Sequence, residues 1–183
     1  MRGAAQVQTH EERTIYRALS ILRNRMVENG VSLSSPAEVR RYLWLRLSQE
    51  ERELFMVLWL DAQNRLIDAE VAAIGTLTQT SVHPRELVKS GLRHNAAAAI
   101  LAHNHPSGRP DPSSADRALT RVIRVAFELV DIRTLDHFII AGEHALSFAE
   151  HGLMGDVPAE LAESKRTTAR PRRGRKRRKV AKR

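Results

Sequence analysis

The strongest constraint on the fold is a run of seven consecutive apolar residues, LFMVLWL, at positions 54–60. A strand that faces solvent on one side alternates apolar and polar residues, whereas a strand covered on both faces is apolar throughout. We therefore expect 54–60 to be a central strand of a sheet that is covered on both sides. Together with helices flanking the sheet, this predicts an α/β or α+β protein.

Two helices are expected before this strand. Apolar residues at helical spacing, followed by Gly30 as a stop signal, predict an amphipathic helix over 11–29. A second helix opens at Ser35, which can cap free amides, with Pro36 in the first helical position and Glu38 completing a capping box. Its apolar positions are Val39, Leu43 and Leu47. We interpret this helical pair as packing rather than as a DNA-recognition unit.

After the central strand, extended runs alternate with helices. A second extended run, from 65 to about 77, forms a hairpin with 54–60 across a short polar break. A helix from Pro84, an interior strand over 96–102, a helix after Ser113 and a last extended pair follow. That last pair covers 135–140 and 145–148. The expected buried face of the helix after Ser113 is Leu119, Val122, Ile123, Ala126 and Leu129.

The candidate metal-binding and catalytic residues are concentrated at 103–116, where the sequence is HNHPSGRPDPSSAD. On a strand, His103 and His105 project from one face while Asn104 faces away. The loop that follows is rich in proline and glycine and can bring Asp116 back toward the two imidazoles. Because the chain has no cysteine, His, Asp and Glu are its only strong metal ligands. Two His and one Asp leave a fourth tetrahedral position open for water, as in catalytic zinc sites.

Each half of this pattern also has a simpler explanation. A pair of histidines at a strand end can be an ordinary polar pair, and Ser113-x-x-Asp116 can be a helix cap with a first-turn acid. The two halves together, at this spacing, favour a metal site.

The spacing of these residues matches a known signature. The string H-x-H-P, six residues, S-x-x-D resembles that of the JAMM metalloproteases of the JAB/MPN fold, and here it consists of His103, His105, Pro106, Ser113 and Asp116.

The fuller pattern is similar to the RadC family in particular. HNHPSG and PS-x-x-D are preceded by HPRE at 83–86 and followed by LDH at 135–137 and SFAE at 147–150. The resemblance runs from about 35 to 153 and is to the short form, without the helix-hairpin-helix domain. It implies a JAB/MPN-like mixed sheet flanked by helices. The family is named for DNA repair, and the resemblance defines fold and site rather than substrate.

The resemblance also implies roles for the site residues. JAMM enzymes hydrolyse peptide or isopeptide bonds with Zn²⁺, which His103, His105 and Asp116 would hold here, while Ser113 would help to hold the tetrahedral intermediate. The alternative is a RadC-like protein that binds nucleic acid or a partner and has a slow or vestigial metal site. We interpret His137 as a hydrogen-bonded core histidine, with a place beside the ligands as the alternative.

Two glutamates are candidates for the general base. Glu70 lies inside an extended run, whereas Glu53 directly precedes the strand 54–60. If that strand is antiparallel to 96–102, its start lies beside the end that carries the two histidines, which favours Glu53. The JAMM glutamate also precedes such a strand, although two glutamates shortly before Glu53 leave the register open.

The charge is distributed unevenly along the chain. Of the 30 basic residues, 12 lie in 165–183, where there is no acid, so the first 164 residues carry 18 basic and 21 acidic side chains, a net charge of −3. We call 165–183 the basic tail and expect it to be disordered, because it has almost nothing apolar to bury. It can bind nucleic acid non-specifically through phosphate neutralisation. A solubility appendage is the alternative.

The expected organisation is an N-terminal helical segment at 1–34, a JAB/MPN domain at 35–155, and a linker with the basic tail at 156–183. Charged residues interrupt the first twenty positions, where a signal peptide would need an apolar stretch. No apolar run approaches the roughly 18 residues of a membrane helix. A cytoplasmic protein is therefore expected.

Overall fold

The computed structural model describes residues 9–28, 36–75 and 82–158. Within them lie four helices and one five-stranded mixed sheet of order β2-β1-β3-β4-β5. The β3–β4 pair is parallel, and the other neighbouring pairs are antiparallel. The helices are α1 (His10–Glu28), α2 (Pro36–Leu47), α3 (Pro84–Arg93) and α4 (Ser114–Glu128), and the strands are β1 (Leu54–Leu60), β2 (Leu66–Ile74), β3 (Ala98–Asn104), β4 (Arg133–Ala141) and β5 (His144–Ser147). The predicted α/β class with a mixed sheet is confirmed.

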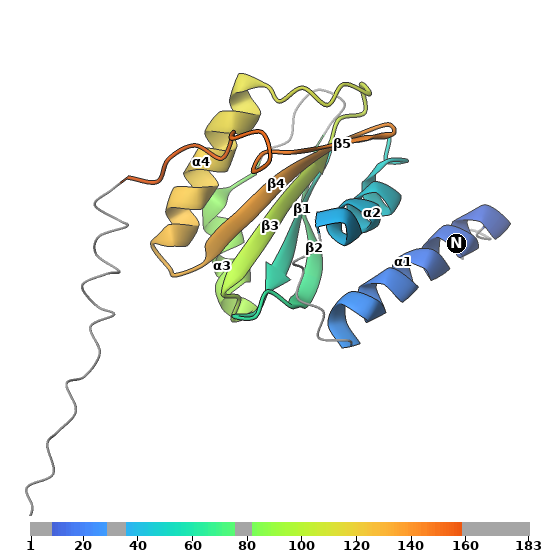
Figure 1. Ribbon diagram of the computed structural model, residues 1–183, viewed down its shortest axis with the longest axis horizontal. Coiled ribbons are helices and arrows are strands. Elements are labelled where there is room, and N and C mark those ends of the chain that lie inside the picture. Colours follow the sequence, from blue (N-terminus) through green and yellow to red (C-terminus); the bar gives the residue numbers. More distant parts are fainter. Residues whose placement is uncertain (1–8, 29–35, 76–81, 159–183) are drawn as a thin grey trace, which may run out of the picture.

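Strand β1 is buried at all seven positions, because its alternating side chains enter two different cores. One face packs with α2, and the opposite face packs with α3 and α4. Figure 1 shows this arrangement, with α1 and α2 on one side of the sheet and α3 and α4 on the other. The apolar run at 54–60 thus occupies the middle of a three-layer structure, as predicted.

The buried face of α4 differs from the prediction in part. Its fully buried residues are Thr120, Ile123 and Phe127, whereas Val122 and Leu129 are 53% and 64% exposed. Residues three and four apart share a helix face, while Val122 lies about 100° around the axis from Ile123. Leu129 is the C-cap, beyond the last helical residue. The contact stripe is therefore narrower than the apolar pattern indicated.

Other boundaries shift slightly. Strand β2 ends at Ile74, and β3 begins two residues later than expected and extends through Asn104. The proposed cap at Ser35 and the basic tail lie outside the described residues. Among the helices that the structure describes, none has the length and apolarity needed to cross a membrane.

Candidate metal centre

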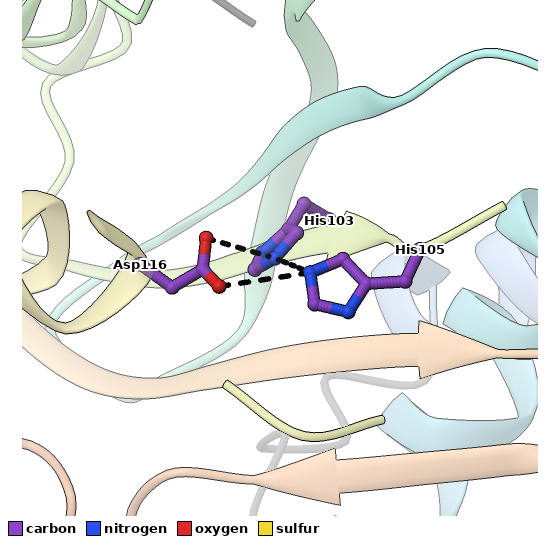
Figure 2. A group of neighbouring side chains, drawn as sticks. All are labelled: His103, His105 and Asp116. Carbon is purple, nitrogen blue, oxygen red and sulfur yellow. Dashed lines mark hydrogen bonds and ion pairs between the residues drawn. The ribbon is translucent and has the colours of Figure 1, made fainter. Parts of the chain in front are cut away.

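The predicted ligands come from two elements that meet where β3 ends. His103 lies near the end of β3, His105 directly follows it, and Asp116 lies in the first turn of α4. Strand β1 runs antiparallel to β3, and Phe55 is in register with His103. Figure 2 shows both imidazoles facing the Asp116 carboxylate. The fold therefore brings together the three residues that the sequence separates by up to thirteen positions.

The donor atoms are close enough to share one metal ion. The Nε2 atoms of His103 and His105 are 3.0 Å apart. Asp116 Oδ1 lies 3.4 Å from His103 Nε2, and Oδ2 lies 3.6 Å from His105 Nε2. Ligands about 2.0–2.1 Å from a tetrahedral zinc ion are separated by roughly 3.3 Å. The two Asp116 separations are to different oxygens, but one donor atom from each residue can be chosen so that all three lie within 4.8 Å of one another, which fits a shared metal ion.

Asp116 is placed by the cap of α4. The Ser113 backbone amide and hydroxyl donate to Asp116 Oδ2 at 2.7 and 2.6 Å, and the Asp116 amide donates to Ser113 Oγ at 3.1 Å. This is a capping box, so the simpler interpretation of the Ser113-x-x-Asp116 pattern is correct as well. The box uses Oδ2, which also lies 3.6 Å from His105 Nε2, while Oδ1 lies 3.4 Å from His103 Nε2. The expected role of Ser113 at a reaction intermediate stays a prediction.

His105 is oriented by the loop that follows it. Its Nδ1 lies 2.8 Å from the carbonyl oxygen of Arg109. A carbonyl can only accept, so Nδ1 carries a proton, and Nε2 is the nitrogen that faces the other two predicted ligands. A second partner of this kind commonly orients histidines that bind metals. The proline-rich loop thus sets the ring nitrogen that faces the site.

His103 is 2% exposed and lies against the ring of Phe55, with the ring centroids 6.3 Å apart. Its Nδ1 is 2.8 Å from Nε2 of His137, which is fully buried. His137 is thus a hydrogen-bonded core histidine, and it also touches a candidate ligand. Both interpretations offered from the sequence apply to it.

The surroundings shift the pKa values of the three predicted ligands in different directions. Burial lowers the pKa of His103 to about 4. The interaction with Asp116 raises the pKa of His105, and the charge of Glu53 adds to this effect. Partial burial raises the pKa of Asp116, but interactions with His105, Ser113 and His103 outweigh it and hold that pKa well below 3.8. His103 and Asp116 are thereby kept in the deprotonated forms that bind a divalent cation, whereas Asp116 favours the protonated form of His105.

The two candidate bases occupy different places. Glu53 immediately precedes β1, is half-buried, and acts electrostatically on His105. It lies two residues before Phe55, which is in register with His103. The Glu70 carboxylate instead accepts a 2.9 Å hydrogen bond from Trp59 Nε1 and another from the Ser90 hydroxyl. Trp59 is four residues, about 13 Å, along β1 from Phe55. The structure therefore does not bring Glu70 to His103 and His105.

Asn104 faces away from the histidines, as expected, and has an unforeseen role. Its Oδ1 accepts from the Leu54 amide at 2.7 Å, and its Nδ2 donates to the carbonyls of Glu50 and Arg52 at 3.1 and 3.0 Å. These bonds hold the backbone on both sides of Glu53. Only the β1–β3 register creates them, so no local pattern could have indicated them.

A groove of about 480 Å³ opens beside His105. Its lining includes Glu50, Glu51, Asn104, His105, Pro106 and Gly142. Of the three predicted ligands, His105 is the one that lines this groove.

Comparison with known proteins agrees with this geometry. A family model described as a RadC-like JAB domain matches residues 33–153. The chain is 63% identical over 126 residues to a UPF0758 protein of Thiobacillus denitrificans, covering 69% of this chain and 56% of that relative. It is 59% identical over 123 residues to a UPF0758 protein of Chromobacterium violaceum, covering 67% of this chain and 55% of the relative.

A third relative is matched over nearly its whole length. The UPF0758 protein YkfG of Escherichia coli K12 is 51% identical over 144 residues, covering 79% of this chain and 91% of the relative. By contrast, the chain spans little more than half the length of the two relatives above. Because the family model matches more than half of the chain, the chain belongs to the family of RadC-like JAB domains.

Proposed function

We propose that this protein is a zinc-dependent hydrolase of peptide or isopeptide bonds. The observation that carries the proposal is the convergence of His103, His105 and Asp116, whose donor atoms all lie within 4.8 Å of one another. Their spacing suits tetrahedral zinc, and a hydrogen bond at the far nitrogen orients each imidazole. Zinc bound there would lower the pKa of a water molecule and polarise the substrate carbonyl.

The residues around the ligands supply the remaining chemistry. The Glu53 carboxylate accepts a proton as water attacks the carbonyl carbon, and it returns that proton to the nitrogen when the C–N bond breaks. Ser113 turns its hydroxyl from Asp116 toward the developing oxyanion. The groove beside His105 is the surface on which a substrate segment would bind. The products are a carboxylate and an amine.

A matched pair of variants tests the proposal. Glu53→Gln removes the base and keeps the size, while Glu70→Gln makes the same change at a glutamate remote from His103 and His105. Zinc-loaded proteins are incubated with a mixed peptide library and with isopeptide-linked peptides, and new amine termini are counted by mass spectrometry.

Wild type and Glu70→Gln should generate the same new termini, whereas Glu53→Gln should bind zinc normally and generate none. A wild-type protein that produces no new termini overturns the hydrolase proposal. Equal activity in Glu53→Gln removes Glu53 from the mechanism.

We also propose that the basic tail binds nucleic acid independently of this site. The support is the charge distribution, since all excess positive charge lies in 165–183 and the preceding residues sum to −3. This would add a sequence-independent attachment to DNA or RNA and would not require hydrolysis.

A further inference from the structure

Behind His103 lies a chain of buried hydrogen bonds that returns to the backbone of another ligand. It runs from the Asp116 carbonyl through the Thr120 hydroxyl and the His137 ring to His103. Thr120 and His137 are both 0% exposed. The chain joins α4, β4 and β3, the three elements that meet at the site.

The donor and the acceptor of each hydrogen bond can be assigned by starting from the Asp116 carbonyl. The Thr120 hydroxyl lies 2.6 Å from the Asp116 carbonyl oxygen, which can only accept, so its hydrogen is committed there. The Thr120 oxygen must then accept from Nδ1 of His137, 2.6 Å away. A neutral His137 with its proton on Nδ1 has a lone pair on Nε2. That lone pair faces Nδ1 of His103 at 2.8 Å, so His103 Nδ1 is the donor.

Buried aromatic side chains hold both rings in place. The Phe148 ring lies 4.7 Å from His137, and Phe55 contacts both imidazoles. A neutral imidazole has a single N–H, so fixing the proton on Nδ1 leaves Nε2 of His103 as a lone pair aimed at the metal position.

We propose that Thr120 and His137 are positioning residues that lock His103 in the tautomer able to bind metal. Carboxylates, backbone carbonyls and water commonly perform this task in metal sites. Here a second imidazole performs it, and the hydroxyl of Thr120 sets that imidazole in turn. The inference rests on the proposed metal site, but the tautomer itself is a property of the metal-free protein.

The first test measures that tautomer directly. Imidazole ¹⁵N resonances of the metal-free wild-type protein should show His103 and His137 both protonated on Nδ1 at neutral pH. His103 protonated on Nε2 instead overturns the inference. This measurement needs no variant and no activity, so its result is separate from that of the hydrolase experiment.

The second test uses a matched pair of variants at Thr120, near the start of this series of hydrogen bonds. Thr120→Val keeps the shape and removes the hydroxyl, while Thr120→Ser keeps the hydroxyl. Zinc titration should show affinity falling about 10- to 100-fold in Thr120→Val, the usual cost of losing an outer partner. Thr120→Ser should stay within about threefold of wild type.

The free energy of unfolding of the metal-free variants provides the control. If Thr120 has only a structural role, Thr120→Val will change the free energy of unfolding but leave the zinc affinity and the His103 tautomer as in wild type. That result would contradict the inference. If Thr120→Val does not fold, the wild-type tautomer and the Thr120→Ser affinity decide the question.

Discussion

Replacing Asn104 with alanine should destabilise the protein and disable the site without removing its metal ligands. The Asn104 side chain is 2% exposed and makes three hydrogen bonds to the backbone around Glu53. The two carbonyls that it contacts belong to a partly exposed segment, where water can replace the lost donor. The Leu54 amide, in contrast, belongs to a residue that is 5% exposed.

The loss in free energy of unfolding can be worked out from these contacts. Each of the three hydrogen bonds contributes about 1 kcal/mol net, and a buried donor left unpaired costs about 1–3 kcal/mol. The two bonds to carbonyls, about 1 kcal/mol each, and the unpaired Leu54 amide, about 1–3 kcal/mol, give a loss of about 3–5 kcal/mol. A domain with a typical stability of about 5–15 kcal/mol can lose this much and still be mostly folded.

The assay is urea unfolding at pH 7, paired with zinc titration and hydrolysis. Asn104→Ala should unfold at lower urea, bind zinc with near-normal affinity, and lose hydrolysis because Glu53 is no longer held. Asn104→Asp has the same shape but turns a carboxylate oxygen toward two carbonyls, so it should be at least as unstable. A change below about 1 kcal/mol in both variants, within the range of ordinary surface substitutions plus error, would refute the reasoning.

Three further predictions concern other parts of the chain. Hydrogen bonds lower the pKa of Glu70 despite its burial, so its contribution is present above pH 4.5 and is lost as pH falls through the folded-state pKa. Glu70→Gln should therefore destabilise most at pH 7 and least at pH 3 in urea unfolding; a constant difference would contradict this. In Gly91→Ala, the new methyl would lie 2.6 Å from Ile132 Cδ1 and 3.0 Å from Trp59 Cζ3. Overpacking costs about 1–3 kcal/mol against a helix gain of at most about 1 kcal/mol, so thermal unfolding should show a lower Tm rather than a higher one. Truncation after Ser164 should abolish binding to duplex DNA and flatten its salt dependence; unchanged binding would exclude the basic tail.

Much of the fold follows from local patterns because the decisive interactions are local or periodic. An apolar run on both faces of 54–60 required two covering layers, and strand alternation required His103 and His105 to share a face. The capping box of α4 then fixed where Asp116 would lie. These signals predict the α/β class and the candidate ligands, whereas the JAB/MPN-like mixed sheet and the roles of the site residues followed from the resemblance to the RadC family.

The supporting residues could not be predicted in the same way. The contact between Thr120 and His137 joins α4 to β4, seventeen residues apart, and exists only once both pack against β3. The bonds of Asn104 span about fifty residues and depend on the β1–β3 register. Similarly, the exposure of Val122 depends on how α4 is rotated against the sheet. Tertiary packing, rather than propensity, decides each of these positions.

The central claim is that His103, His105 and Asp116 hold one zinc ion, and calorimetric zinc titration tests it most directly. The wild-type protein should bind one zinc per chain, and His103→Ala, His105→Ala and Asp116→Ala should each lose tight binding while folding normally by circular dichroism. A wild-type protein that binds no zinc, or single variants that all retain the full stoichiometry and affinity, would contradict the account.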